Sequence, residues 1–251
     1  MRKSLNSESK MITLLGSGFV FLAILFIWQL SSKSFLVPSV METIKYLVKD
    51  IRNGAILFYA QNTFGASFIA FGLSIVFGSL LGIFLGLVHY WRRVLEPIVL
   101  GAYSIPKIIL FPIFVVLFGL GMGLHIFNGF IHGLFPMIIN VTTGLKEINP
   151  ALLKVGKSYQ CNFYQFLTKI YLPAIALPFI IGVRLAFSLS IIGVILIEIL
   201  IKGQGLGTQI MMAYEFQQLP KMFSYMVFLF GIAFLGNICW WAIERRLAKT
   251  R

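Results

Sequence analysis

Four long stretches without any Asp, Glu, Lys or Arg constrain this chain more than any other feature of its sequence. They cover residues 11–32, 61–91, 108–145 and 222–243. About 20 apolar residues carry a helix across the roughly 30 Å hydrocarbon core of a bilayer, so each stretch is long enough for one crossing. The chain is also 59% hydrophobic and 12% charged, more apolar surface than one soluble core of this size can bury. We therefore predict an all-α, multi-pass membrane protein.

The apolar runs together predict about six transmembrane helices. The run at 108–145 is long enough for nearly two crossings, and a further apolar run lies near 174–200. The first run is too long for the apolar core of a cleaved signal peptide, so we expect an uncleaved anchor. The predicted spans lie near 11–31, 64–90, 98–118, 124–143, 174–200 and 222–243 of a single transmembrane domain, 1–251.

Basic residues are distributed unevenly between the two predicted sides of the membrane. With the tails at 1–10 and 244–251 both in the cytoplasm, thirteen of the 21 lysines and arginines fall on the cytoplasmic side. Six fall outside, and two, Lys107 and Arg184, fall within spans. This asymmetry follows the positive-inside rule and predicts a bacterial cytoplasmic (inner) membrane protein in contact with lipid. Topology thus accounts for the net charge of +13, and no basic patch remains for a nucleic-acid partner.

The sequence shows no pattern typical of a metal site, a disulfide or a nucleotide-binding loop. The three histidines have no metal-ligand spacing, and Cys161 and Cys239 are predicted to lie in a cytoplasmic loop and in a span. No Gly-x4-Gly-Lys-Ser/Thr phosphate loop occurs, and the Gly-Gln-Gly-Leu-Gly run at 203–207 lacks the lysine. We expect this chain to bind no metal or cofactor itself and to hydrolyse no ATP.

The segment at 34–62 is predicted to be an extracytoplasmic interfacial helix segment. Ser39 and Glu42 have the spacing of a capping box, which should start a helix. Apolar side chains recur at helical spacing on one face, and charged side chains occupy the other. The apolar positions are Val40, Ile44, Leu47, Val48, Ile51 and Ile56, and the charged ones are Lys45, Lys49 and Asp50.

The second predicted span carries a stripe of small residues that favours close helix packing. Ala66, Ala70 and Ser74 are followed by Gly78, Gly82 and Gly86, each four residues from the next. In lipid, close packing of small residues joins helices, since apolar side chains gain little by leaving apolar solvent. The stripe is explained equally by packing within one subunit or by a dimer face.

Two prolines, Pro106 and Pro112, interrupt the third predicted span and should kink or break it near mid-membrane. Either neighbouring helices satisfy the freed backbone groups, or the break lines a pathway where irregular backbone meets water or solute. Lys107 favours the pathway, because an ionisable side chain within a span usually faces protein or a wet cavity.

Arg184 and Glu198 are further candidates for a translocation pathway, which Lys107 and Arg184 would bias towards anions. Each also has a purely structural interpretation. Arg184 can extend to the interface or bind carbonyls at a helix end, and Glu198 can lie near the outer interface beside Lys202.

The longest polar interruption between spans, 144–172, has the signals of two short helices. Asn149 is a good N-cap and Pro150 suits the first helical position, so one helix should run from Pro150 to Tyr159. Asn162, with Gln165 three residues later, should start a second helix that runs to Ile170 and is ended by the Leu-Pro pair at 172–173. The pair is either a docking element for another protein or an amphipathic hairpin on the lipid, anchored by its aromatic side chains. Those aromatic residues are Phe163, Tyr164, Phe166 and Tyr171.

This segment resembles the cytoplasmic "EAA" loop of ABC importer permeases. The resemblance rests on Asn-Pro-Ala-Leu-Leu at 149–153, then Val155 and Ser158, followed by a helix and Leu-Pro at 172–173. Further motifs, in order along the chain, are similar to the nitrate, sulfonate, taurine and bicarbonate branch of that family. They are Leu-Val-Pro-Ser at 36–39, Ile-Pro-Lys-Ile-Ile-Leu-Phe-Pro-Ile-Phe at 105–114, Phe-Gly at 118–119, Gly-Val-Arg-Leu-Ala at 182–186, Gly-Val at 193–194 with Glu198, and Glu-Arg-Arg-Leu at 244–247.

The resemblance implies the type I ABC importer transmembrane fold and a docking role for the loop, and it covers nearly the whole chain from about residue 35. Lys154 replaces the motif's glutamate, Gly156 its second alanine and Gln160 its turn glycine. Glutamine enters the left-handed conformation at a steric cost, so Asn162 could host that conformation more readily. The residues implied for ATPase coupling are Leu153, Lys154, Gly156, Ser158, Tyr159, Gln160, Asn162, Phe163 and Tyr164.

By the same resemblance, the chain is expected to be the non-catalytic permease subunit of an ATP-driven importer. It would work as a homodimer with two ATPase subunits, which bind ATP and Mg, and with an extracytoplasmic solute-binding protein. The favoured solute is a sulfonate, taurine, nitrate or similar small anion, and the alternative is a vitamin or pyrimidine precursor. Two other classes are a membrane scaffold or channel and an intramembrane enzyme. The enzyme is disfavoured because His132 has no catalytic neighbour at helical spacing and no Gly-x-Ser-x-Gly occurs.

Overall fold

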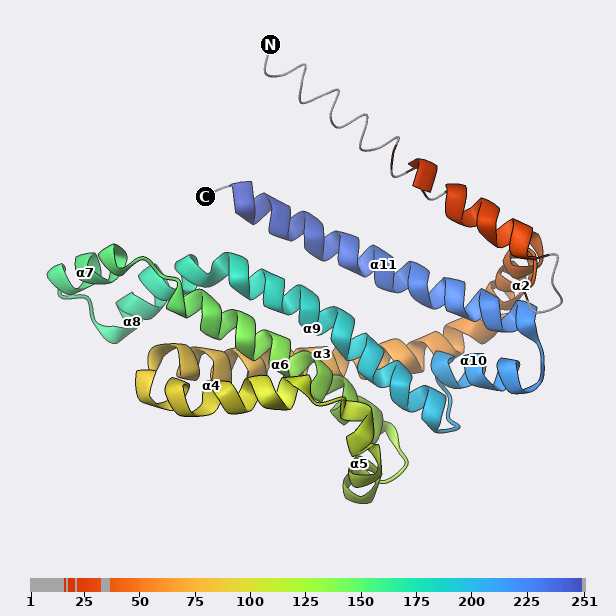
Figure 1. Cartoon of the computed structure of the whole chain (residues 1–251), viewed down its shortest axis with the longest axis horizontal. Coiled ribbons are helices and arrows are strands. Elements are labelled where there is room, and N and C mark those ends of the chain that lie inside the picture. The colour runs from red at the N-terminus through yellow and green to blue at the C-terminus, as the bar shows by residue number, and fades with distance from the viewer. Residues whose placement is uncertain (1–15, 17, 21, 33–36, 250–251) are drawn as a thin grey trace, which may run out of the picture. The chain divides into compact units, whose positions relative to one another are not determined.

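The computed structural model describes residues 16, 18–20, 22–32 and 37–249, and helices are the only regular secondary structure in these ranges (Figure 1). A 3-10 helix, Lys107–Leu110, precedes α5, and a π-helical turn, Leu167–Tyr171, joins α8 to α9. The all-α prediction is confirmed for the described residues. The α-helices are α2 (Val40–Arg52), α3 (Ala55–Leu87), α4 (His89–Ser104), α5 (Phe111–Phe118), α6 (Met122–Lys146), α7 (Pro150–Ser158), α8 (Phe163–Phe166), α9 (Leu172–Leu200), α10 (Leu206–Glu215) and α11 (Leu219–Lys249).

Four helical segments are long and apolar enough to cross a membrane. They are Ala55–Leu87, Met122–Lys146, Phe163–Leu200 and Leu219–Ala248. The predicted first span at 11–31 lies partly outside the described residues, and its described part is helical at 22–31. The described residues therefore supply four spans, or five if the bent pair discussed next counts as one, where six were predicted.

The third predicted span is bent, as its prolines indicate. α4 ends at Ser104, and the helical segment Lys107–Phe118 that follows leaves at 87°. Pro106 is the N-cap of the 3-10 helix and Pro112 lies in the first turn of α5. Neither position needs a backbone N–H for an intrahelical bond, so both prolines are accommodated by starting a new helix. The predicted break is confirmed.

The described residues form two compact units, and the first comprises those within 1–56 and 209–228. In this unit α2 begins with the predicted capping box: the Ser39 hydroxyl accepts from the Glu42 N–H at 3.2 Å, and the Glu42 carboxylate accepts from the Ser39 N–H at 3.0 Å. Gly54, at φ +73°, then turns the chain into α3. The segment predicted as one piece at 34–62 is therefore divided by this turn. Ile56, expected on the apolar face of α2, is a fully buried residue of α3.

The second unit, residues 57–208 and 229–251, is built around α6 and α9, which lie side by side along most of their length (Figure 1). Their buried apolar residues include Met137 and Val141 of α6 and Val183 and Ala186 of α9. Polar side chains reinforce the packing, since the Asn128 amide donates to the Gly193 carbonyl at 2.6 Å. Inside a bilayer such a bond satisfies groups that no water can reach.

The glycine stripe of α3 lies against α6 within the same subunit. A Cβ placed on Gly78 would lie 2.6 Å from Met137 Cβ, and one on Gly82 would lie 2.7 Å from Val141 Cβ. Gly86 meets the Leu145 side chain in the same way, and its Cβ would lie 2.7 Å from Leu145 Cβ. These distances are shorter than any side chain tolerates, so the three glycines set the approach of α3 to α6.

Candidate coupling hairpin and polar groups of the spans

The two short helices predicted in the polar segment form a hairpin, α7 and α8, at one end of α6 and α9 (Figure 1). Asn149 caps α7 by accepting from the Ala151 N–H at 2.9 Å, and Pro150 is the first helical residue. At α8, Asn162 accepts from the Gln165 N–H at 2.8 Å, and the Gln165 side chain accepts from the Asn162 N–H at 2.9 Å. Both predicted helix starts are confirmed.

The turn between α7 and α8 is a Schellman motif centred on Gln160. Gln160 has φ +49°, its N–H donates to the Lys157 carbonyl, and the Cys161 N–H donates to the Gly156 carbonyl, both at 3.0 Å. Asn162, which was expected to host the left-handed conformation, instead has φ −74° as the N-cap of α8. The expectation was wrong because that position needs extended backbone for capping, which leaves the left-handed position to glutamine.

Gly156 is where α7 touches the helix that follows it. Gly156 is buried, and a Cβ added there would lie 2.5 Å from Ile170 Cδ1 and 2.8 Å from two ring atoms of Phe166. The bulk of these two side chains explains why glycine stands where the EAA motif has alanine. Gly156 was predicted as a coupling residue, and its place in the structure is at a contact inside the hairpin.

The remaining predicted coupling residues divide into inward and outward groups. Leu153 packs against the buried cluster of α6 and α9. The side chains of Tyr159, Phe163 and Tyr164 are 80%, 70% and 71% exposed. Lys154, Ser158, Gln160 and Asn162 are also exposed. The hairpin therefore presents three aromatic side chains on a locally well-capped frame.

The second helix of the hairpin does not end at Leu172-Pro173, which corrects the prediction. Phe163 to Leu200 is one 38-residue helix, with the π-helical turn Leu167–Tyr171 placed directly before the proline. A proline inside a helix lacks the N–H for the usual bond and its ring crowds the preceding turn. A widened π-helical turn at that point relieves the crowding, so the helix continues into the membrane span.

The three ionisable residues predicted for a pathway have separate surroundings. Among the described residues, no hydrogen bond or ion pair joins any two of Lys107, Arg184 and Glu198. Lys107 is 9% exposed and its ammonium donates to the Tyr103 carbonyl at 3.1 Å. The same ammonium lies 5.1 Å from the ring centres of Tyr103 and Phe135, a cation–π arrangement.

Arg184 forms an ion pair with Glu244 of α11 at 3.2 Å. Both side chains are less than one-third exposed. The structure therefore gives Arg184 a carboxylate partner in another helix. The partners predicted from the sequence were helix-end carbonyls or an anionic solute. The Glu-Arg-Arg-Leu motif at 244–247 supplies that partner.

Glu198 is the most buried acid of the described spans, at 3% exposure. Its carboxylate accepts from the Thr63 hydroxyl at 2.8 Å and 3.0 Å and from the Gly207 N–H at 2.8 Å. The Thr63 oxygen in turn accepts from the Leu206 N–H at 2.8 Å. This network holds the start of α10.

Sequence reasoning missed the partners of Glu198. Thr63 lies 135 residues away in the chain, so no local pattern connects the two. The glycine run at 203–207 was an available local signal, because glycines let the backbone lie close to another group. A Cβ on Gly205 would overlap the Glu198 carboxylate, and one on Gly207 would lie 2.8 Å from Glu198 Cβ. Both glycines thus allow the chain to lie directly on the acid.

The chain matches the family described as "binding-protein-dependent transport system inner membrane component" over residues 74–249. It belongs to that family. The permease is 23% identical over 233 residues, 91% of this chain and 84% of the relative, to the putative aliphatic sulfonates transport permease protein SsuC of Bacillus subtilis. It is 28% identical over 195 residues, 74% of this chain and 76% of the relative, to the formylaminopyrimidine transport permease protein ThiX of Halalkalibacterium halodurans.

Bicarbonate, nitrate and taurine permeases are also among the relatives of this permease. The fold is similar to an inward-facing structure of the MetNI methionine ABC transporter, with a TM-score of 0.65 at 19% identity over 76% of this chain and 96% of that one. The predicted resemblance to the sulfonate, taurine, nitrate and bicarbonate branch is confirmed. Its relatives are transporter permeases, subunits that are not themselves catalytic.

Proposed function

We propose that this permease forms the membrane pathway of an ATP-driven importer for a small anion and that α7 and α8 couple it to ATPase subunits. The working complex would be a homodimer of the permease with two ATPases, which bind ATP and Mg, and a solute-binding protein on the outer face. Both termini and the hairpin would face the cytoplasm. The exposed aromatic group Tyr159, Phe163 and Tyr164 carries this proposal.

The geometry of the hairpin suits docking. A Schellman turn and a capping box hold the backbone that carries its three aromatic side chains, so little backbone freedom is lost when a partner covers them. Aromatic anchors that enter a partner's pocket supply most of the binding energy of a small contact. Closure of an ATP-bound ATPase pair would draw two such hairpins together and rock the attached spans.

The nature of the solute rests on the relatives and on Lys107. The sulfonate permease matches across 91% of this chain, which favours a sulfonate or a similar small anion. Lys107 lies within a bent span, and no carboxylate among the described residues forms an ion pair with its ammonium, which therefore offers a positive charge for such a solute. A pyrimidine precursor is the second candidate, supported by the formylaminopyrimidine permease at 28% identity. Uptake of labelled taurine, nitrate and a formylaminopyrimidine, in cells with and without this permease, separates the candidates.

Docking is tested by two substitutions that place negative charges on the hairpin. The permease carrying Phe163→Asp and Tyr164→Asp is purified from cells in mild detergent, and the bound ATPase is quantified. Loss of two anchors of about 2 kcal/mol each should reduce ATPase retention well over tenfold and abolish uptake. Phe216→Asp, a change of an equally exposed aromatic residue outside the hairpin, is the control and should keep both.

Two results would remove the proposal. One is normal uptake with normal ATPase retention in the doubly charged hairpin variant. The other is labelling of Cys161 from the outer face of the membrane in a Cys239→Ser background, because a hairpin on that side cannot reach an ATPase.

A further inference from the structure

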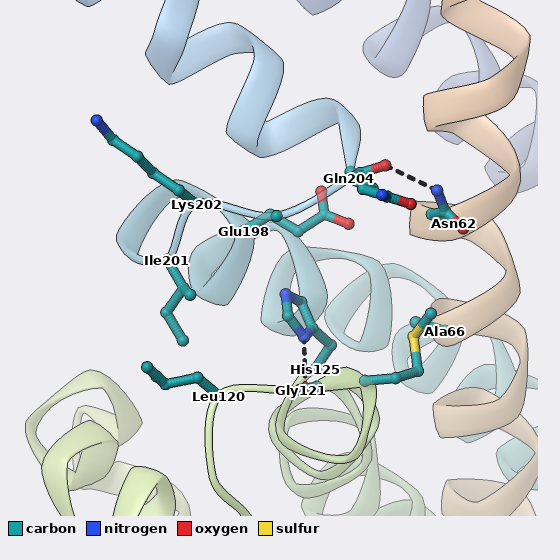
Figure 2. Close-up of a pocket in the computed structure, with 12 residues that line it drawn as sticks. Asn62, Ala66, Leu120, Gly121, His125, Glu198, Ile201, Lys202 and Gln204 are labelled. Atoms are coloured by element: carbon teal, nitrogen blue, oxygen red, sulfur yellow. Dashed lines mark hydrogen bonds between the residues drawn. The ribbon is translucent and has the colours of Figure 1, made fainter.

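A cavity of about 180 Å³ lies at the end of α9 far from the hairpin (Figure 2). α3, α6 and α9 form its walls, together with the chain at 201–205. A water molecule takes about 30 Å³ in the liquid, so the cavity has room for a small organic molecule. Its lining combines apolar and polar side chains. The apolar residues include Ala66, Leu120, Met122 and Ile201, and the three polar side chains considered below are Asn62, His125 and Glu198.

Each of these three polar side chains is fixed by a bond that leaves an acceptor atom unused. The Asn62 amide nitrogen donates to the Gln204 carbonyl at 2.9 Å, which leaves its Oδ1 as an acceptor. His125 Nδ1 lies 2.9 Å from the Gly121 carbonyl. A carbonyl can only accept, so Nδ1 carries the hydrogen and Nε2 of the neutral ring is an acceptor.

Glu198 adds further acceptor capacity. Its two oxygens receive one hydrogen from Thr63 and one from the Gly207 N–H, whereas an ionised carboxylate has about four acceptor positions. Gly205 covers one side of the carboxylate so closely that a Cβ there would overlap it. The side that borders the cavity is therefore the one that remains for a ligand.

No basic side chain among the described residues neutralises Glu198. The Lys146–Glu96 and Arg184–Glu244 ion pairs do not include it. Lys202 lines the same cavity, but Figure 2 shows its ammonium directed away from the carboxylate. A buried carboxylate without a positive partner is costly, and a cation in the cavity would offset that cost.

We propose that this cavity binds a small organic cation with N–H donors, such as a primary ammonium, seated against Glu198. Asn62 Oδ1 and His125 Nε2 would accept the remaining N–H groups, and the apolar wall would hold the carbon part of the ligand. A metal ion fits less well, because no group of three His, Cys, Asp or Glu side chains occurs among the described residues. The site is independent of the proposed coupling to an ATPase.

The test compares three probes of similar size on the full-length permease in detergent. Ethylammonium has charge and N–H donors, tetramethylammonium has charge alone, and ethanesulfonate has the opposite charge. Unfolding is followed by tryptophan fluorescence, with sodium chloride added to equal ionic strength. Ethylammonium should raise the unfolding midpoint saturably, by about 2–4 °C at roughly five times its Kd, while tetramethylammonium does less and ethanesulfonate nothing.

Variants then locate the site. Glu198→Gln keeps the shape and removes the charge, and it should weaken ethylammonium at least tenfold. Glu96→Gln, which changes a partly exposed acid elsewhere in the second unit, should leave the shift intact. If Glu198→Gln does not fold, His125→Leu, at a half-buried wall position, should give the same loss.

Each outcome either supports or overturns the proposed cation site. A saturable ethylammonium shift that both site variants weaken supports the proposal. An absent shift, an equal shift in Glu198→Gln, protection by ethanesulfonate, or protection by Zn²⁺ or Mn²⁺ alone would overturn it. None of these results bears on ATPase retention, so failure here leaves the importer proposal to its own test.

Discussion

Gln160 offers the sharpest test of the hairpin's construction, because it adopts a backbone conformation that suits glycine. At φ +49° a residue with a Cβ carries about 1–2 kcal/mol of strain, which Gln160→Gly removes. Glycine also gains freedom in the unfolded chain, which costs about 0.4–1 kcal/mol. The net stabilisation of the turn is therefore about 1 kcal/mol. Gln160→Val should have the opposite sign, because a β-branched side chain fits this region poorly.

Hydrogen–deuterium exchange of the hairpin amides measures this change directly. The relevant donors are the N–H groups of Gln160 and Cys161, which bond to the carbonyls of Lys157 and Gly156. A gain of about 1 kcal/mol slows exchange through local opening roughly fivefold in Gln160→Gly. Gln160→Val should speed the same amides by a similar factor or more.

The chain contains its own control for this experiment. Gln217 has φ +54° in an equivalent turn after α10, where its N–H donates to Tyr214 and the Gln218 N–H donates to Ala213. Gln217→Gly should protect these amides and leave the hairpin unchanged. Faster or unaltered exchange at 160–161 in Gln160→Gly, or slower exchange in Gln160→Val, would refute the strain argument.

Three further predictions concern packing and charge. Gly156→Ala should cost about 1–3 kcal/mol of local hairpin stability, seen as faster amide exchange at 150–166, because its Cβ has no room. Gly82→Val should lower the thermal midpoint of the permease by several degrees. Its control is Gly72→Val in the same helix, which should change the midpoint little because nothing lies within 4 Å of an added Cβ there. Equal losses in the two variants would contradict the packing role of Gly82. The Arg184–Glu244 pair should show a coupling of about 1 kcal/mol in a double-mutant cycle of Arg184→Gln and Glu244→Gln, and a value near zero would show that solvent or lipid headgroups screen it.

The helix starts of the polar segments were predictable because their signals are local. Ser39, Asn149 and Asn162 each place a side-chain oxygen within reach of an N–H two or three residues later, and each caps a helix in the structure. The break at Pro106 could also be predicted, since proline fixes its own φ and lacks a backbone N–H. These signals need no knowledge of the rest of the fold.

Contacts between segments that are distant in the sequence could not be predicted from such local signals. The Glu198 network joins residues 135 apart, and the bond from Asn62 to Gln204 spans 142 residues. The choice between Gln160 and Asn162 for the left-handed position also went wrong, because the competing demand for capping at Asn162 outweighed its intrinsic tolerance. Local propensity decides such a case only when no hydrogen bond competes.

The unbroken helix from Phe163 to Leu200 has a mechanical consequence for the proposed coupling. Had Pro173 ended the helix, a flexible joint would separate the hairpin from the span that follows. Instead the π-helical turn at 167–171 keeps the helix continuous, and Gly156 brings α7 into contact with Phe166 of that same helix. A displacement imposed on the exposed aromatic side chains therefore passes into α9 through helix backbone and one packed contact. The weakest part of this path is the π-helical turn, so bending should concentrate there during transport.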